Sequence, residues 1–303
     1  MYSPSSPKRL LILLSSFFTL FGLNAHATNP TDVQFSVITT ARSGGAQEAM
    51  VVQSGSWFTQ RQLVHVAVLI QHPQGDLLWD SGIGSEVEEQ MENFAFWEKQ
   101  LFKIQDINPA RQQMEQAGYQ FDRLKAIIPS HMHWDHASGL EDFIGTPIWI
   151  QADELEAARE GKPPAFVQSQ FDSSQLRWKF IELAPNKILG FQRSLDIYGD
   201  GSAILLDLSG HTRGQLGLLL TTQDKGRFLF IGDTTWAIEG VNRNKSRPVF
   251  VDWLAGIDDD FDKNAKVVDA LYQLHQAHPD ITIVPAHDER VAADLPAYPE
   301  FSK

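Results

Sequence analysis

His131-Met132-His133-Trp134-Asp135-His136 places three imidazoles and one carboxylate within six residues of the chain. Imidazole nitrogens and carboxylate oxygens are the ligands that catalytic zinc sites take from proteins. An apolar run from Leu124 to Ile128 precedes this motif and predicts a buried strand that ends at Pro129-Ser130. The motif therefore lies on a loop at a strand end, where a rigid scaffold can direct several side chains at one point.

Three more residues of ligand type follow apolar, strand-like runs later in the chain. They are His211 after the run 203–208, Asp233 after 227–231, and His287 after 281–284. Within the motif, alternation lets His131 and His133 face one metal ion while Asp135 and His136 turn to a second. Seven such residues at separate strand ends indicate a metal centre rather than histidines buried in a packed core.

The pattern HxHxDH, followed by a strand-end histidine, a strand-end aspartate and a late histidine, resembles the metallo-β-lactamase-fold hydrolases. The resemblance extends from Val33 to about Arg290. It implies an α/β fold of the αββα sandwich type, in which two mixed sheets pack face to face with helices on the outside. The metal ions are then expected at one edge of the sandwich, held by loops.

The resemblance also implies which residues hold two divalent metal ions, with zinc as the first expectation. His131, His133 and His211 match the first metal site, and Asp135, His136 and His287 match the second. Asp233 matches the carboxylate that bridges the two metals. Asp80, at the end of another predicted strand, matches an acidic residue that supports the metal loops; a turn aspartate before Gly82 is the alternative.

The chemistry expected of such a centre is hydrolysis. Two metals lower the pKa of bound water to about 7, which provides a hydroxide to attack an ester-type bond at neutral pH. We expect Asp135 and Asp233 to take part in catalysis as ligands. Three stretches resemble the N-acyl homoserine lactonases in particular: SGHTRGQLGLLL (209–220), FLFIGDTT (228–235) and ITIVPAHDE (281–289). A lactone is therefore the expected substrate.

Trp236 departs from the lactonase pattern, which commonly has a tyrosine three residues after the bridging aspartate. We expect Trp236 to contact the substrate, although an indole N–H has no acidic proton to deliver. The departure admits a phosphotriester or aryl ester hydrolase of the same fold. A glyoxalase II-like thioesterase and a non-catalytic zinc-binding protein are further alternatives.

Residues 1–27 have the features of a cleaved signal peptide. Lys8-Arg9 is basic, the run from Leu10 to Leu23 is apolar but short for a membrane span, and Ala25-His26-Ala27 fits a cleavage site. We expect a periplasmic or secreted protein with no stable membrane anchor, in which residues 28–303 form a single hydrolase domain. The chain contains no cysteine, so neither a disulfide nor a lipidated cysteine is available.

The charge of the chain narrows its partners. The net charge is −13, and removal of residues 1–27 takes away two basic residues and no acidic one, which leaves −15. A chain this acidic offers no basic stripe to nucleic acid, so we expect a small neutral substrate with an apolar part. The aromatic segment 91–102 could line the substrate pocket, belong to the core or form the surface of a homodimer.

The remaining elements are expected as alternating strands and helices. Strands are predicted at 33–39, 63–70 and 76–79, and helices at 109–117, 153–160 and 261–276. Four further histidines lack the strand-end context and are expected to be structural or exposed: His65, His72, His275 and His278.

Overall fold

The computed structural model describes residues 32–302, apart from 93 and 225. The predicted signal peptide, residues 1–27, lies outside the described residues. No helix among the described residues is long and apolar enough to cross a membrane.

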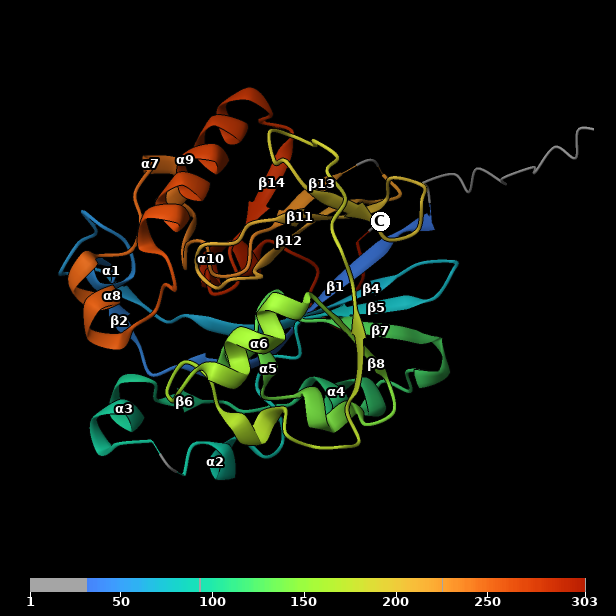
Figure 1. Cartoon of the computed structure of the whole chain (residues 1–303), viewed down its shortest axis with the longest axis horizontal. Helices are drawn as coiled ribbons and strands as arrows, with labels where there is room; N and C mark the ends of the chain where they lie inside the picture. The colour runs from blue at the N-terminus through green and yellow to red at the C-terminus, as the bar shows by residue number, and fades with distance from the viewer. Residues whose placement is uncertain (1–31, 93, 225, 303) are drawn as a thin grey trace, which may run out of the picture.

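Two mixed sheets form the centre of the molecule (Figure 1). The larger sheet has the strand order β6-β1-β4-β5-β7-β8-β9. Its strands in that order are Ile104–Gln105, Gln34–Ser43, Val64–Gln71, Asp76–Trp79, Leu124–Ile128, Pro147–Ile150 and Arg177–Phe180. The strands from β6 to β5 pair antiparallel, whereas those from β5 to β9 pair parallel.

The smaller sheet has the order β10-β11-β12-β13-β14. Its strands are Ser194–Asp196, Ala203–Asp207, Leu216–Thr221, Arg227–Phe230 and Ile281–Val284. All pairs are antiparallel except β13 and β14, which are parallel. A short ribbon of β2 (Ala46–Gln47) and β3 (Gln60–Arg61) lies apart from both sheets.

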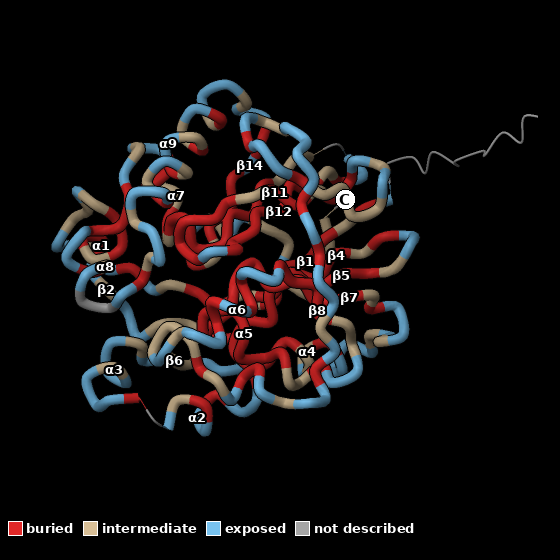
Figure 2. Tube along the Cα trace, in the orientation of Figure 1, coloured by how far each residue is buried: buried red, intermediate tan, exposed pale blue. Residues whose placement is uncertain are grey.

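The inner faces of the two sheets pack against each other. Phe35 on β1 makes edge-on contacts with Phe228 and Phe230 on β13, with ring centroids 4.7 and 5.5 Å apart. Around them, Val68, Leu77, Leu205 and other alternate residues of both sheets form one buried cluster. Figure 2 shows these strands as the buried centre of the molecule. Burial of this apolar surface is the main force that holds the sheets together.

Helices cover both outer faces. α4 (Ala110–Gln116) and α6 (Ala152–Glu160) pack on the larger sheet, where Met114 and Leu155 meet Ile127. α7 (Ile238–Arg243) and α9 (Phe261–Ala277) pack on the smaller sheet, where Leu271 meets Leu229. This arrangement confirms the predicted αββα sandwich of the metallo-β-lactamase type. Short helices fill the connections: α1 (Glu48–Val51), α2 (Val87–Gln90), α3 (Phe96–Leu101), α5 (Trp134–Ala137), α8 (Val249–Ala255) and α10 (Glu289–Ala293).

Candidate metal centre

Seven predicted ligands converge at one edge of the sandwich. His131, His133, Asp135 and His136 lie on the loop and short helix that follow β7, and the other three follow β11, β13 and β14. The strands β5 and β7 run parallel and end at this edge. All seven side chains are buried. Each sheet therefore contributes part of the cluster.

Glycines at two positions allow the smaller sheet to deliver its ligands. Gly210, before His211, lies so close to α9 that a Cβ would be 2.6 Å from the backbone nitrogen of Asn264. Gly232, before Asp233, has a φ of +53°, a left-handed conformation that costs glycine little. Both turns direct the following side chain into the cluster.

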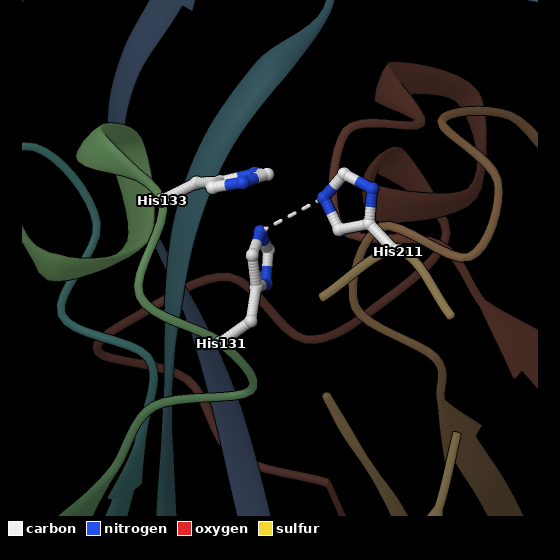
Figure 3. Close-up of side chains that lie close together, drawn as sticks. All are labelled: His131, His133 and His211. Carbon is white, nitrogen blue, oxygen red and sulfur yellow. Dashed lines mark hydrogen bonds between the residues drawn. The ribbon is translucent and has the colours of Figure 1, made fainter. Parts of the chain in front are cut away.

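The first group consists of His131, His133 and His211 (Figure 3). The Nε2 atoms of His131 and His211 are 3.1 Å apart, and the three rings meet edge to face at centroid distances of 4.5–4.7 Å. Burial lowers the pKa of all three histidines, and neighbouring histidines lower that of His131 and His133 further. Neutral rings offer nitrogen lone pairs to a metal ion.

The second group lies beside the first. Nε2 of His287 is 3.3 Å from Nε2 of His136 and 3.3 Å from Oδ2 of Asp135. Asp233 completes the group, because its Oδ1 lies 3.2 Å from His136 Nε2 and 3.0 Å from His287 Nε2. These are the spacings expected between ligands of a common tetrahedral ion.

Asp233 lies between the two groups. Its Oδ2 is 3.7 Å from Nε2 of His211, which belongs to the first group. The potential ligand atoms of His131, His136 and Asp233 also lie within 4.8 Å of one another. The cluster is therefore continuous rather than divided into two separate sets, and Asp233 lies close to ligands of both groups.

Hydrogen bonds on the outer side of the rings fix which nitrogen faces the cluster. His136 Nδ1 is 3.0 Å from Asp80 Oδ2, and His287 Nδ1 donates to the carbonyl of Val64 at 2.8 Å. With Nδ1 of both rings donating, the two Nε2 atoms present lone pairs to each other and to Asp233. Such an arrangement of acceptors requires positive charge, and a divalent cation fits it.

The pKa shifts agree with this demand for positive charge. Burial opposes protonation of both His136 and His287. The negative charges of Asp80 and Asp233 outweigh burial at His136, and that of Asp233 does so at His287. The pKa values of both histidines are therefore raised. Burial likewise opposes ionisation of Asp233, but His287 and His136 hold its pKa well below the usual range. The donor set and its charge therefore fit bound dications.

Asp80, the predicted support of the metal loops, contacts both the loop after β7 and one histidine of the motif. Oδ1 accepts a hydrogen bond from the backbone N–H of Ser130 at 2.6 Å while Oδ2 faces His136. Its backbone is left-handed, with a φ of +56°, so the turn proposed as the alternative is present as well. The tight turn after β5 is what brings the carboxylate beneath the motif.

Two supporting residues were not predicted from the sequence. Asp258 Oδ1 is 2.8 Å from Nδ1 of His211. Arg247, which is almost fully buried, pairs with Asp258 and donates from Nη1 to the backbone carbonyl of Asp233 at 2.5 Å. Neither residue follows an apolar strand, so the strand-end signal could not select them.

Trp236 and His65 also border the cluster. The indole N–H of Trp236 donates to Asp233 Oδ2 at 2.8 Å, so this hydrogen is directed at the carboxylate rather than into open space. His65, for which the sequence predicts a structural or exposed position, lies with its Nδ1 3.0 Å from Asp135 Oδ2. His72 instead pairs with Asp200 at 3.0 Å and stacks on Tyr198.

A cavity of about 160 Å³ opens beside the cluster. Asp135, Asp233, His287 and Trp236 line it, and most of the other lining side chains are apolar, among them Met50, Val51, Leu63, Leu101, Phe102, Trp134, Val251 and Ile257. The aromatic residues of the segment 91–102 thus lie in different environments. Phe94 packs on Trp134 in a small core cluster, Phe102 borders the cavity, and Phe96 is exposed.

The chain belongs to the metallo-β-lactamase superfamily, whose sequence profile matches residues 61–287. Among curated proteins, an N-acyl homoserine lactonase of a Bacillus species is 30% identical over 174 residues, which are 56% of this chain and 64% of that protein. The N-acyl homoserine lactonase AttM of Agrobacterium fabrum is 26% identical over 242 residues, 77% of this chain and 85% of that protein. The match thus spans less than two thirds of the Bacillus relative.

Solved structures of the same fold include lactonases. An N-acyl homoserine lactone hydrolase with N-hexanoyl-L-homoserine at its catalytic metal centre superposes with a TM-score of 0.68, at 21% identity, over 89% of this chain and 98% of that chain. AidC, a dizinc quorum-quenching lactonase, gives a TM-score of 0.58 at 14% identity over 89% of each chain. At these identities the likeness shows the fold alone.

Proposed function

We propose that this chain is a dinuclear metal-dependent hydrolase that opens the ring of N-acyl homoserine lactones. The observation that carries the proposal is the position of Asp233 between two groups of buried ligands, in the lining of a mainly apolar cavity. The curated relatives with this activity support it, and the family profile matches residues 61–287, which include all seven ligand positions. Zinc suits the nitrogen and oxygen donors, as do manganese, iron and cobalt.

A pair of divalent metals, when bound, supplies a nucleophile from water at neutral pH and withdraws charge from the substrate carbonyl. The residues of the chain hold and orient this centre. His131, His133 and His211 form one side of it, and Asp135, His136 and His287 form the other. Asp233 holds the two sides together.

The cavity determines which substrates fit. Its apolar lining suits an acyl chain, and Asp233 and His287 in the same lining would lie next to the ester-type bond. Among the described residues that line it, Lys103 is the one basic side chain apart from histidines, so this lining offers little to a polyanion. This environment and the acidic chain favour a neutral substrate over nucleic acid.

A phosphotriester or aryl ester is the second candidate, and Trp236 is the observation that favours it. The N–H of Trp236 is engaged by Asp233, and an indole does not deliver a proton. A lactone must release an alkoxide, which needs a proton, whereas an aryl oxide departs more readily without one. A chain that lacks a tyrosine at this position is therefore suited to substrates with aryl leaving groups.

The experiment is a substrate panel with purified, metal-loaded protein. N-Hexanoyl homoserine lactone, an aryl phosphotriester, p-nitrophenyl acetate and a glutathione thioester are compared by kcat/KM, with and without chelator. We expect the lactone to be the best substrate and chelator to abolish turnover. Fast phosphotriester cleavage without lactonase activity would promote the second candidate. Preference for the thioester would indicate a glyoxalase II-like enzyme, and no turnover would indicate a non-catalytic metal-binding protein.

We propose further that residues 1–27 direct export to the periplasm or medium and are then removed. The basic, apolar and small-residue segments of this stretch support the proposal. N-terminal sequencing of the protein recovered from a bacterial periplasm should begin at Thr28. An intact N-terminus in the cytoplasmic fraction would contradict it.

A further inference from the structure

The first two residues of β4 each contact a predicted metal ligand. The Val64 carbonyl accepts the Nδ1 hydrogen of His287 at 2.8 Å, and the Val64 N–H donates to the His287 carbonyl at 3.2 Å. The next residue, His65, lies with Nδ1 3.0 Å from Asp135 Oδ2. Because β4 is antiparallel to β5, its first residues lie at the edge where β5 ends.

The contact between His65 and Asp135 is a buried, charge-assisted hydrogen bond. The side chains of His65 and Asp135 are only 8% and 9% exposed. A carboxylate oxygen can only accept, so Nδ1 of His65 carries the hydrogen. The accepting atom, Oδ2, is also the oxygen of Asp135 that faces His287 Nε2 at 3.3 Å. His65 therefore acts on the oxygen that would ligate the metal.

The surrounding structure holds His65 in place. Its backbone carbonyl accepts the Thr40 hydroxyl at 2.9 Å, and the Thr40 oxygen accepts the Ile83 N–H at 2.9 Å. Thr40 lies where the register of β1 shifts against β4, so a β-bulge directs its hydroxyl there. The His65 ring contacts the rings of Trp134 and His287 at centroid distances of 5.8 and 5.1 Å.

We propose that His65 is a positioning residue for the second metal group, which orients Asp135 Oδ2 toward His136 and His287. The proposal rests on the dinuclear centre of the proposed function. Charge-assisted hydrogen bonds are short and directional. Loss of such a partner of a metal ligand typically weakens metal binding by about 10- to 100-fold.

The test measures zinc binding, independently of turnover, in the unsubstituted protein and in three variants. His65→Leu removes the donor. His65→Asn places an amide N–H near the position of Nδ1, and His65→Gln places it near that of Nε2. Zinc per chain is measured by elemental analysis, and the affinity of the weaker site by competition with a chromogenic chelator. We expect about 10- to 100-fold weaker binding of the second zinc in His65→Leu and His65→Gln, with recovery in His65→Asn.

His72→Leu is the matched control, because His72 follows the other end of β4 and forms a buried pair with Asp200 away from the ligands. It should lose thermal stability without losing zinc. If His65→Leu does not fold, the comparison of the Asn and Gln variants decides. Equal second-site affinity in the Asn and Gln variants and the unsubstituted protein would overturn the role of His65 alone. An unsubstituted protein that binds fewer than two zinc ions would overturn the dinuclear centre as well.

Discussion

Asp233 is the residue at which the two ligand groups meet, so its removal tests the dinuclear centre most directly. In Asp233→Ala, two dications would lack their shared anion. We expect the metal content to fall from two ions per chain toward one and kcat/KM to fall by about 100-fold or more. Elemental analysis and steady-state kinetics on a lactone measure both effects.

The control for this variant is Asp224→Ala, because Asp224 is an exposed residue in the turn before β13. Circular dichroism should show that both variants keep the fold, since the apolar core between the sheets is unchanged. Near-normal turnover and two bound metals in Asp233→Ala would mean that another carboxylate bridges the ions.

Trp236 lines the cavity and donates to Asp233, and substitutions can separate these two contacts. Trp236→Phe keeps an aromatic wall but removes the N–H bound to Asp233. A hydrogen bond to a charged group contributes about 1.5–3 kcal/mol, so we expect kcat to fall by about 10-fold or more with little change in KM. Trp236→Ala should also raise KM, because the wall of the cavity is lost.

Trp236→Tyr supplies a hydroxyl that can donate a proton, and we expect it to retain or improve lactonase activity. The three variants are compared on a lactone and on an aryl phosphotriester. If all of them change only the melting temperature and leave kcat and KM intact in the folded fraction, Trp236 is a structural residue and has no part in catalysis.

At the scale of elements, α6 connects the two sheets through one buried carboxylate. Glu154 accepts the backbone N–H of Met132 at 2.7 Å and that of Gly214 at 2.8 Å. These residues lie on the loops that carry the ligands of the larger and of the smaller sheet. Glu154 therefore fixes the distance between the two loops.

Glu154→Ala would leave two buried N–H groups without acceptors, at a cost of about 1–3 kcal/mol each. We expect the melting temperature to fall by about 5 °C or more, and zinc affinity to fall with it. Thermal unfolding and chelator competition measure the two effects. Glu156→Ala, an exposed position on the same helix, should change neither; equal losses in the two variants would mean that α6 acts only through its general stability.

The sequence predicts elements well where local pattern decides them. β5, β7 and β14 have the predicted bounds, and α9 extends one residue past its prediction, to Ala277. β1 continues to Ser43 instead of ending at Thr39. A bulge at Thr40 lets pairing with β4 resume, and such a feature depends on the partner strand rather than on local sequence.

At the scale of the whole molecule, the sequence predicts the residues of the cluster and the supporting Asp80, but not the other residues that contact the cluster. The ligands follow strand ends and have distinctive residue types, so pattern alone selects them. His65 lies near the start of an antiparallel strand, and Arg247 and Asp258 lie outside the described strands. Their place beside the ligands depends on tertiary packing, which the periodicity of hydrophobic residues in the local sequence does not encode.

The cluster also joins the two halves of the molecule, which predicts a stability effect of metal removal. The larger sheet contributes His131, His133, Asp135 and His136, and the smaller sheet contributes His211, Asp233 and His287. Metal that binds only the folded chain stabilises it by mass action, by about 4 kcal/mol at 1,000 times the dissociation constant. We therefore expect a chelator to lower the melting temperature by about 5–10 °C, and added zinc to restore it.

The same chelator should lower the melting temperature of Asp233→Ala much less, because that variant binds less metal from the start. A melting temperature that does not respond to the chelator, in protein shown by elemental analysis to have lost its metal, would mean that the sheets are held together by their apolar core alone.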